Sequence, residues 1–294
     1  MLCDRYFKEI EFRIAKDKER GASQLYLEAL RIVKKWLEEH VLDEDCFRKL
    51  LARLVKGQPS MAPMLNLANN LLLALEEGWD RVREFVEAEL EGYERKMEAV
   101  VECALAQLSS YGRFATTSYS STLLHLFRRL GAERKALLFV ARGAPVPYGL
   151  RLADGLKEWV ETVITTDALL PFVVRKVDAV VVGADSVDEN GVVNGAGTFS
   201  LALAARWFEK PFYVVCSTEK FLPSLLSRYH VVREEEYPEE LSSGHRVEYH
   251  IFDVTPVELV TGFITERGFM GLEDFLEYQR GLRVSEQFHS IMEL

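Results

Sequence analysis

The chain has 294 residues, 48% of them apolar and only 9 of them proline, which is the composition of a folded protein with one large domain or two ordinary ones. Its 46 acidic residues outnumber its 36 basic residues, and the formal charge of −10 argues against nonspecific nucleic-acid binding, which needs a basic face. The apolar runs are far shorter than the ~20 residues of a membrane span, and residues 1–20 are charged rather than signal-like, so we expect a cytoplasmic protein.

The first third of the chain predicts a helical domain. Between Tyr6 and Ser109, apolar residues recur at intervals of three and four, which is the spacing of amphipathic helices. Glycine and proline interrupt this pattern in KGQPS at 56–60, and glycine interrupts it in EEGWD at 76–80, so we expect helices to end there. We assign residues 1–110 to this domain.

The pattern after Gly112 predicts an α/β domain that covers residues 111–294, including a C-terminal tail. Short β-rich runs occupy residues 136–140, 162–166, 179–183, 212–216 and 249–252, and helical segments occupy residues 148–159, 168–176 and 198–208. Strands that alternate with helices indicate a mainly parallel sheet with helices on both faces, that is, a Rossmann-like domain. The acidic, proline-containing run at 233–240 is typical of a solvated loop.

The cysteines and histidines indicate neither a metal site nor a disulfide framework. Cys3, Cys46, Cys103 and Cys216 lie far apart with no CxxC pair, so we expect four free thiols, mostly buried. The six histidines form no HExxH motif and no cluster with carboxylates. We therefore expect no metal and no cofactor.

Polar residues follow the predicted strands at the points where these strands end. In an open parallel sheet, ligands bind outside the carboxyl ends of the strands. The loops in these places carry six residues that could form a polar mouth: Arg142, Asp167, Asp185, Ser217, Thr218 and Lys220.

The segment NGAGTFS at 194–200 opens a predicted helix with glycines. The free amides of such a helix start favour phosphate or carboxylate, which makes Asn194, Gly195, Gly197 and Thr198 candidate ligand-binding residues. The structural alternative is that Asn194 and Thr198 cap the helix while the glycines form a turn. The segment is not a GxGxxG fingerprint after the first strand, which argues against a nicotinamide dehydrogenase.

Four segments in the same order resemble the translation initiation factor 2B alpha/beta/delta subunit family: residues 58–69, 118–127, 183–218 and 252–268. That family includes methylthioribose-1-phosphate isomerase and the archaeal ribose-1,5-bisphosphate isomerase. The resemblance implies a helical domain followed by a Rossmann-like domain of the ribose-5-phosphate isomerase type, assembled as dimers or larger oligomers. It also implies that the GAD aspartate and the glycine-containing helix start help to form a sugar-phosphate site.

The resemblance assigns catalytic positions to two residues. Asp185 matches the acid/base aspartate of the isomerases, and Ser118 stands where they have a cysteine. A serine hydroxyl is far less acidic than a thiol, so it does not readily act as an acid without an adjacent base. The structural alternatives are a helix-start or turn role for Ser118 and a helix-cap or interface role for Asp185.

Cationic positions of the isomerases are also replaced. Gly195 stands in place of a phosphate-facing lysine, Gln58 in place of an arginine before proline, and Ala144 in place of a loop arginine. Arg142 and Arg151 are the cations left to compensate.

These departures favour a noncatalytic member of the family, a regulatory or scaffold protein that forms a homo-oligomer. Its expected partners are a phosphorylated small molecule, either a sugar phosphate or a nucleotide, and a translation factor. Two alternatives remain open. One is an aldose-ketose isomerase that uses Asp185 with Ser118, and the other is a pure protein-interaction module with an empty pocket.

Overall fold

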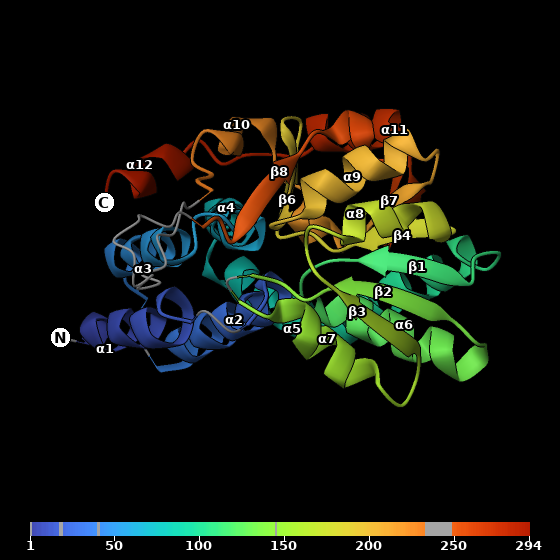
Figure 1. Cartoon of the computed structure of the whole chain (residues 1–294). Coiled ribbons are helices and arrows are strands. Elements are labelled where there is room, and N and C mark those ends of the chain that lie inside the picture. Colours follow the sequence, from blue (N-terminus) through green and yellow to red (C-terminus); the bar gives the residue numbers. More distant parts are fainter. Residues whose placement is uncertain (1, 18–19, 40–41, 145, 233–248) are drawn as a thin grey trace, which may run out of the picture.

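The computed structural model describes residues 2–17, 20–39, 42–144, 146–232 and 249–294. The chain forms a helical half and an α/β half that lie side by side (Figure 1). The predicted solvated loop at 233–240 falls outside the described residues.

The helical half confirms the helical prediction for the first third of the chain. It consists of α1 (Leu2–Ile10), the π-helical segment η1 (Glu11–Ala15), α2 (Ala22–Glu39), α3 (Glu44–Gly57), α4 (Ala62–Glu77) and α5 (Trp79–Gln107). The breaks lie where glycine and proline predict them, since α3 ends at Gly57 and Gly78 separates α4 from α5. The side chain of Asp43 caps α3 by accepting from the amides of Asp45 and Cys46.

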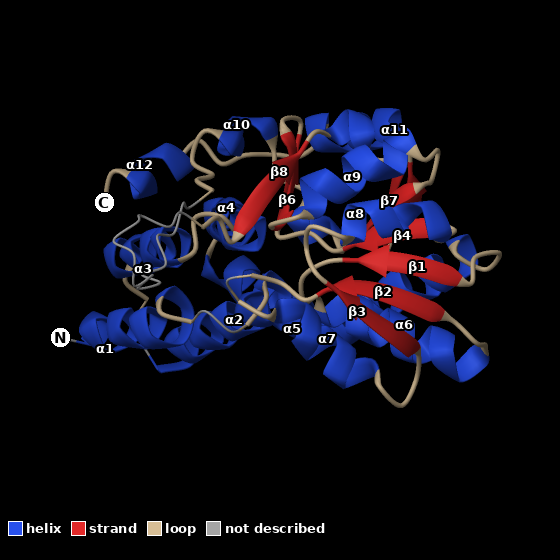
Figure 2. Ribbon diagram, in the orientation of Figure 1, coloured by secondary structure: helices blue, strands red, loops and turns tan. Residues whose placement is uncertain are grey.

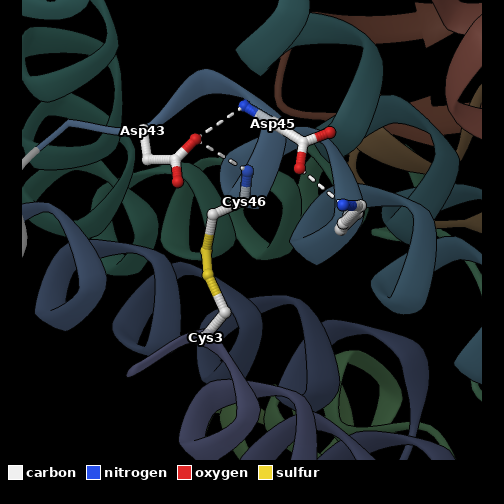
Figure 3. The surroundings of a disulfide bond; sticks show 5 residues. Cys3, Asp43, Asp45 and Cys46 are labelled. Atoms are coloured by element: carbon white, nitrogen blue, oxygen red, sulfur yellow. Dashed lines mark hydrogen bonds and ion pairs between the residues drawn. A yellow bond between two sulfur atoms is a disulfide. The ribbon is translucent and has the colours of Figure 1, made fainter. Parts of the chain in front are cut away.

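Two of the four cysteines are paired, so the expectation of four free thiols is wrong. A disulfide joins Cys3 in α1 to Cys46 in α3, with 6.2 Å between their Cα atoms (Figure 3). Cys103 and Cys216 are free, and Cys216 is buried. The sequence could not reveal this pair, because only the packing of α1 against α3 brings together two cysteines that are 43 positions apart.

The α/β half is built on a seven-stranded sheet in the order β10-β9-β7-β4-β1-β2-β3. Its strands are β1 (Arg113–Thr116), β2 (Leu137–Ala141), β3 (Glu161–Thr165), β4 (Ala179–Val182), β7 (Phe212–Val215), β9 (Gly262–Thr265) and β10 (Gly268–Met270). All neighbours pair in parallel except β10, which runs antiparallel to β9. This confirms the mainly parallel sheet.

Helices cover both faces of this sheet (Figure 2). The end of α5, α6 (Ser121–Glu133) and α7 (Tyr148–Leu156) share one core with Ala179 and Val181 of β4. The helices α8 (Leu170–Val173), α9 (Thr198–Trp207) and α11 (Leu272–Arg280) share the other core with Val180 and Val182. Because β4 is buried on both faces, its sequence is a continuous apolar run.

A second, three-stranded sheet lies beside the first and was not predicted. It pairs β5 (Ser186–Asp188), β6 (Gly191–Gly195) and β8 (Phe252–Thr255) in antiparallel fashion. The strand expected at 249–252 therefore begins only at Phe252 and belongs to this small sheet.

The C-terminal region returns to the helical half. Leu222, Leu226 from α10 (Ser224–Ser227), and Phe288 and Ile291 from α12 (Phe288–Met292) belong to the core formed by α1 to α5. Three short 3-10 turns complete the described elements: η2 (Val174–Lys176), η3 (Thr218–Lys220) and η4 (Val257–Leu259). Within the described residues, no helix has the length and apolar character needed to span a bilayer.

Candidate functional site

The order of the strands places a crevice at the carboxyl ends of β1 and β4. The chain proceeds from β1 to β2 and β3 on one side, and from β4 to β7 and β9 on the other. The loops that follow β1 and β4 therefore diverge, and ligands of open α/β sheets bind at such a point. Ser118 follows β1 and Asp185 follows β4, so the two predicted catalytic residues lie in the loops that flank the crevice.

Ser118 has an unusual backbone and a close contact with Gly195. Its φ is +66°, in the left-handed region that residues other than glycine seldom adopt. Its side chain lies against Gly195, where an added Cβ would be only 2.5 Å from the Ser118 Cβ. Position 195 therefore accommodates a glycine beside Ser118, whereas any side chain there requires Ser118 to move.

The side chains at the start of α9 are bonded to the chain itself. Asn194 Nδ2 donates to Thr198 Oγ1 at 2.9 Å, and Thr198 Oγ1 donates to the carbonyl of Gly195 at 2.6 Å. Thr198 is completely buried and Asn194 is nearly so. Gly197 takes a left-handed conformation, with φ of +101°. These contacts fit the capping and turn roles that the sequence left open.

The free amides of this helix start are occupied by a carboxylate of the chain. Asp253 Oδ2 in β8 accepts from the amide of Gly197 at 2.7 Å and from the amide of Phe199 at 3.1 Å. Burial raises the pKa of Asp253 to about 6, although the amides of the helix start oppose this rise. A phosphate at this position would have to displace Asp253.

Asp185 connects the strand that leads to α9 with the helical half, since its amide donates to the carbonyl of Val193 at 2.8 Å. The carbonyl of Asp185 accepts from the amide of Ala62 at 3.2 Å, where α4 begins. Burial raises the pKa of the Asp185 carboxyl above its ordinary value, and the Lys220 ammonium is the strongest opposing influence. Lys220 is itself buried and donates to the carbonyl of Ala184 at 2.7 Å. A buried carboxyl whose pKa is raised is a candidate for proton transfer.

The cavity beside Ser118 is small. Its volume is about 20 Å³, which is room for about one water molecule. None of the described residues that line it carries a charge: Thr117, Ser118, Gly143, Ala144, Val146, Tyr148, Gly195, Ala196 and Ile251. Asp185 is absent from this lining, so the cavity does not bring the two predicted catalytic residues together.

The predicted cations lie outside this cavity. Arg142 is exposed after β2, where its backbone amide donates to the carbonyl of Thr165 at 2.8 Å. Arg151 in α7 is also exposed, and its guanidinium stacks on the ring of Tyr119 at 4.2 Å from the centroid. Tyr119 adjoins Ser118, so Arg151 holds this loop from the outer side.

Gln58 and Asp253 make contacts that the sequence did not predict. Gln58 donates its amide hydrogens to the carbonyls of Ile14 at 2.8 Å and Asp17 at 3.1 Å. It therefore ties η1 and the segment after it to the end of α3. Asp253 was visible in the FDVTP segment, but nothing in that pattern indicates which amides it would bind. Among the described residues, no three histidines, cysteines or carboxylates lie close enough together to hold a metal ion.

Comparison with known families places this geometry in context. The model described as the initiation factor 2 subunit family matches residues 18–271. The chain belongs to this family. A Pyrococcus abyssi protein named as eIF-2B subunit 2-like is 35% identical over 92% of this chain and 98% of its own length. The crystal structure of Pyrococcus horikoshii eIF-2B superposes with a TM-score of 0.78 at 28% identity, covering 92% of this chain and 97% of that one.

Among the relatives matched by sequence, those with an enzyme name cover a shorter part of the chain, whereas the crystal structure of Pyrococcus horikoshii 5-methylthioribose 1-phosphate isomerase superposes on 93% of this chain and 87% of its own, with a TM-score of 0.69 at 24% identity. Methylthioribose-1-phosphate isomerase of Chloroflexus aurantiacus is 33% identical over 54% of this chain and 50% of its own length. The family thus includes both kinds of protein that the resemblance names.

Proposed function

We propose that this protein is a noncatalytic eIF-2B subunit-like member of the family, with a regulatory or scaffold role. The observation that carries the proposal is the cavity beside Ser118, which has about 20 Å³ of space and no charged residue in its described lining. An isomerase must hold a phosphorylated sugar and stabilise charge on oxygen during proton transfer. Neither the space nor the lining supports that chemistry.

The similar proteins support the same proposal. By sequence, the relatives that match this chain over nearly its whole length have subunit-like names, and those named isomerase match about half of it. By structure, an isomerase covers 93% of this chain at 24% identity, which supports a shared fold and does not separate the two roles. A translation initiation factor as partner rests on those names alone.

A turnover assay tests the proposal. Purified protein is mixed with ribose 1,5-bisphosphate or methylthioribose 1-phosphate, and the ketose product is measured. We expect no turnover above that of the Asp185→Asn variant, since proton transfer by a positioned group contributes about 10² to 10⁴-fold. Turnover that is robust in the wild type and lost in Asp185→Asn would contradict the proposal.

Such a result would favour the second candidate, an aldose-ketose isomerase. The raised pKa of the Asp185 carboxyl, near the buried Lys220, is the observation in its favour. In that case Ser118 would have to move away from Gly195 to admit the substrate.

A phosphorylated small molecule that binds without turnover would use the outer rim of the crevice. Arg142 is exposed there, at the end of β2. We expect ribose 1,5-bisphosphate or a nucleoside monophosphate to raise the melting temperature of the wild type but not of Arg142→Gln. Arg95→Gln, which removes an exposed arginine from α5, is the matched control. An equal shift in all three proteins would place the ligand elsewhere.

An exposed apolar surface supports a homo-oligomer. We call it the α9 face: Phe199, Leu203 and Trp207 follow one another at intervals of four on α9, beside Leu169 and Phe172 near α8. Trp207 is 81% exposed. Contiguous exposed apolar side chains of this size mark interaction sites, and a second copy of the chain is the occupant that we propose.

A further inference from the structure

A second cavity lies between the two halves of the molecule, away from the crevice at β1 and β4. Its volume is about 340 Å³, within the usual range for small-molecule sites. Side chains from α2, α4 and α5 form one wall, and η3 and the segment after α11 form the other. The site does not depend on the function proposed above.

The buried wall of this cavity holds three charged groups. Lys96 Nζ donates to Glu89 Oε2 at 2.9 Å, and the hydroxyl of Tyr26 donates to the same oxygen at 2.8 Å. The second carboxylate, Glu219, is only 9% exposed. Its Oε1 accepts from the hydroxyl of Ser217 at 2.5 Å, whereas its Oε2 lies 3.7 Å from Lys96 Nζ.

Glu219 Oε2 is buried and has no hydrogen-bond partner within the described part of the chain. Lys96 Nζ lies at ion-pair distance, 3.7 Å, but too far for a hydrogen bond, and a buried carboxylate oxygen without a hydrogen bond is costly. Two carboxylates share one ammonium here, and Glu266 adds a further negative charge nearby. The other cation that acts on Glu219 is Lys220, and its ammonium donates to the carbonyl of Ala184. A positively charged donor therefore complements this wall better than a hydroxyl group does.

A positive charge, that of Arg283, lies at the exposed side of the cavity. Arg283 is exposed, and its backbone is fixed because Asn69 Nδ2 donates to its carbonyl at 2.9 Å. Asn69 Oδ1 in turn accepts from the amide of Ser285 at 2.9 Å. These bonds fix the backbone of Arg283 at the cavity, and an arginine guanidinium can bind a carboxylate through two parallel hydrogen bonds. Leu73, Tyr278 and Leu282 add apolar surface to the lining.

We propose that this cavity binds a free α-amino acid with an apolar side chain. Its ammonium group donates to Glu219 Oε2 near Glu89, and its carboxylate binds Arg283. A phosphate ester fits less well, since its negative charge would face the two carboxylates. Because the cavity is lined by both halves of the chain, a bound amino acid holds them together.

The test is a thermal-shift screen of the full-length protein with the natural amino acids at millimolar concentration, followed by calorimetry. We expect at least one apolar amino acid to raise the melting temperature, as any ligand specific for the folded state does. Its N-acetyl derivative, which lacks the ammonium group, and its amide, which lacks the carboxylate, should bind about tenfold more weakly or worse. Inorganic phosphate should have no such effect at this site.

Variants decide whether the binding occurs here. Arg283→Gln changes an exposed side chain, so the protein should fold normally but bind about tenfold more weakly. Glu219→Gln should weaken binding similarly while keeping the shape of the wall. Arg280→Gln, an exposed arginine at the end of α11 that does not line the cavity, is the control. The proposal is wrong if no amino acid binds, if the N-acetyl derivative binds equally well, or if Arg283→Gln binds like the wild type.

Discussion

At the residue scale, the contact between Ser118 and Gly195 determines the space at the crevice. The Ser118 side chain occupies the volume that a side chain at position 195 would need. The left-handed φ of Ser118 directs it there, and such a conformation costs about 1 kcal/mol or more in a residue other than glycine. The presence of glycine at position 195 is therefore coupled to the conformation of Ser118.

This coupling is measurable in a double-mutant cycle. Gly195→Ala should destabilise the protein by about 1–3 kcal/mol, because its Cβ would lie 2.5 Å from that of Ser118. In a Ser118→Gly background the same change should cost much less, since the obstructing side chain is gone. Urea unfolding of the four proteins gives the coupling free energy. Equal costs in both backgrounds would show that the two residues do not compete for space.

The candidate site was predictable only in part, for reasons visible at single residues. Asp185 directly follows a continuous apolar run, so its place at a strand end could be inferred from the sequence. Asp253 could not be placed, because it reaches the amide of Gly197, 56 positions earlier, only through the pairing of β8 with β6. The positions of Arg142 and Arg151 depend on loop conformation, which charge patterns do not encode.

At the element scale, the start of α9 is an anion site that the chain fills with its own carboxylate. Asp253→Ala should destabilise the protein by about 1–2 kcal/mol, since it leaves the amides of Gly197 and Phe199 without their acceptor. Phosphate should then bind the vacant helix start and raise the melting temperature of the variant more than that of the wild type. Melting curves in phosphate and in chloride at equal ionic strength make the comparison. The same phosphate effect in both proteins would refute the idea that Asp253 blocks this site.

The same residue gives a pH dependence with a definite sign. Burial raises the pKa of Asp253 from 3.8 to about 6, so the folded protein binds this proton more tightly than the unfolded chain does. The stabilisation is complete below pH 3.8 and is lost as the pH rises through 6, with a maximum on the order of 2–3 kcal/mol. Asp253→Asn keeps an oxygen acceptor for the amides but does not titrate. The stability of the wild type relative to this variant should fall between pH 4 and pH 6. A rise over this range would show that folding does not raise the pKa of Asp253.

At the scale of the whole molecule, hydrophobic periodicity predicted the two halves but not every strand. The run at 179–182 is apolar throughout because β4 is buried on both faces, and this pattern can be recognised from the sequence alone. Strand β1 has only four residues and begins with an exposed arginine, so its central place in the sheet depends on pairing with β2 and β4. The return of Phe288 and Ile291 to the helical core likewise depends on tertiary packing, because their five-residue helix is too short to show a clear hydrophobic periodicity.

Assembly of the whole molecule provides the last prediction. On α9, Leu201, Ala202 and Ala205 are buried against the sheet, whereas Leu203 and Trp207 point outward. A helix that is apolar on both sides is expected to be covered on both sides, and the second cover that we propose is the α9 face of another copy. Wild-type protein should therefore sediment as a dimer or a larger closed assembly at micromolar concentration. The double variant Leu203→Glu with Trp207→Glu should sediment as a folded monomer, because the charges would be desolvated in the interface.

A matched control separates this surface from exposed apolar residues in general. Leu225 in α10 is 67% exposed and does not belong to the α9 face, so Leu225→Glu should leave the assembly intact. Circular dichroism should show the same helix content in all three proteins, because none of these side chains is buried within the monomer. A monomeric wild type would remove the need for a second copy. A double variant that still assembles would instead locate the interface on another surface, and the outward side of α9 would then need a different occupant.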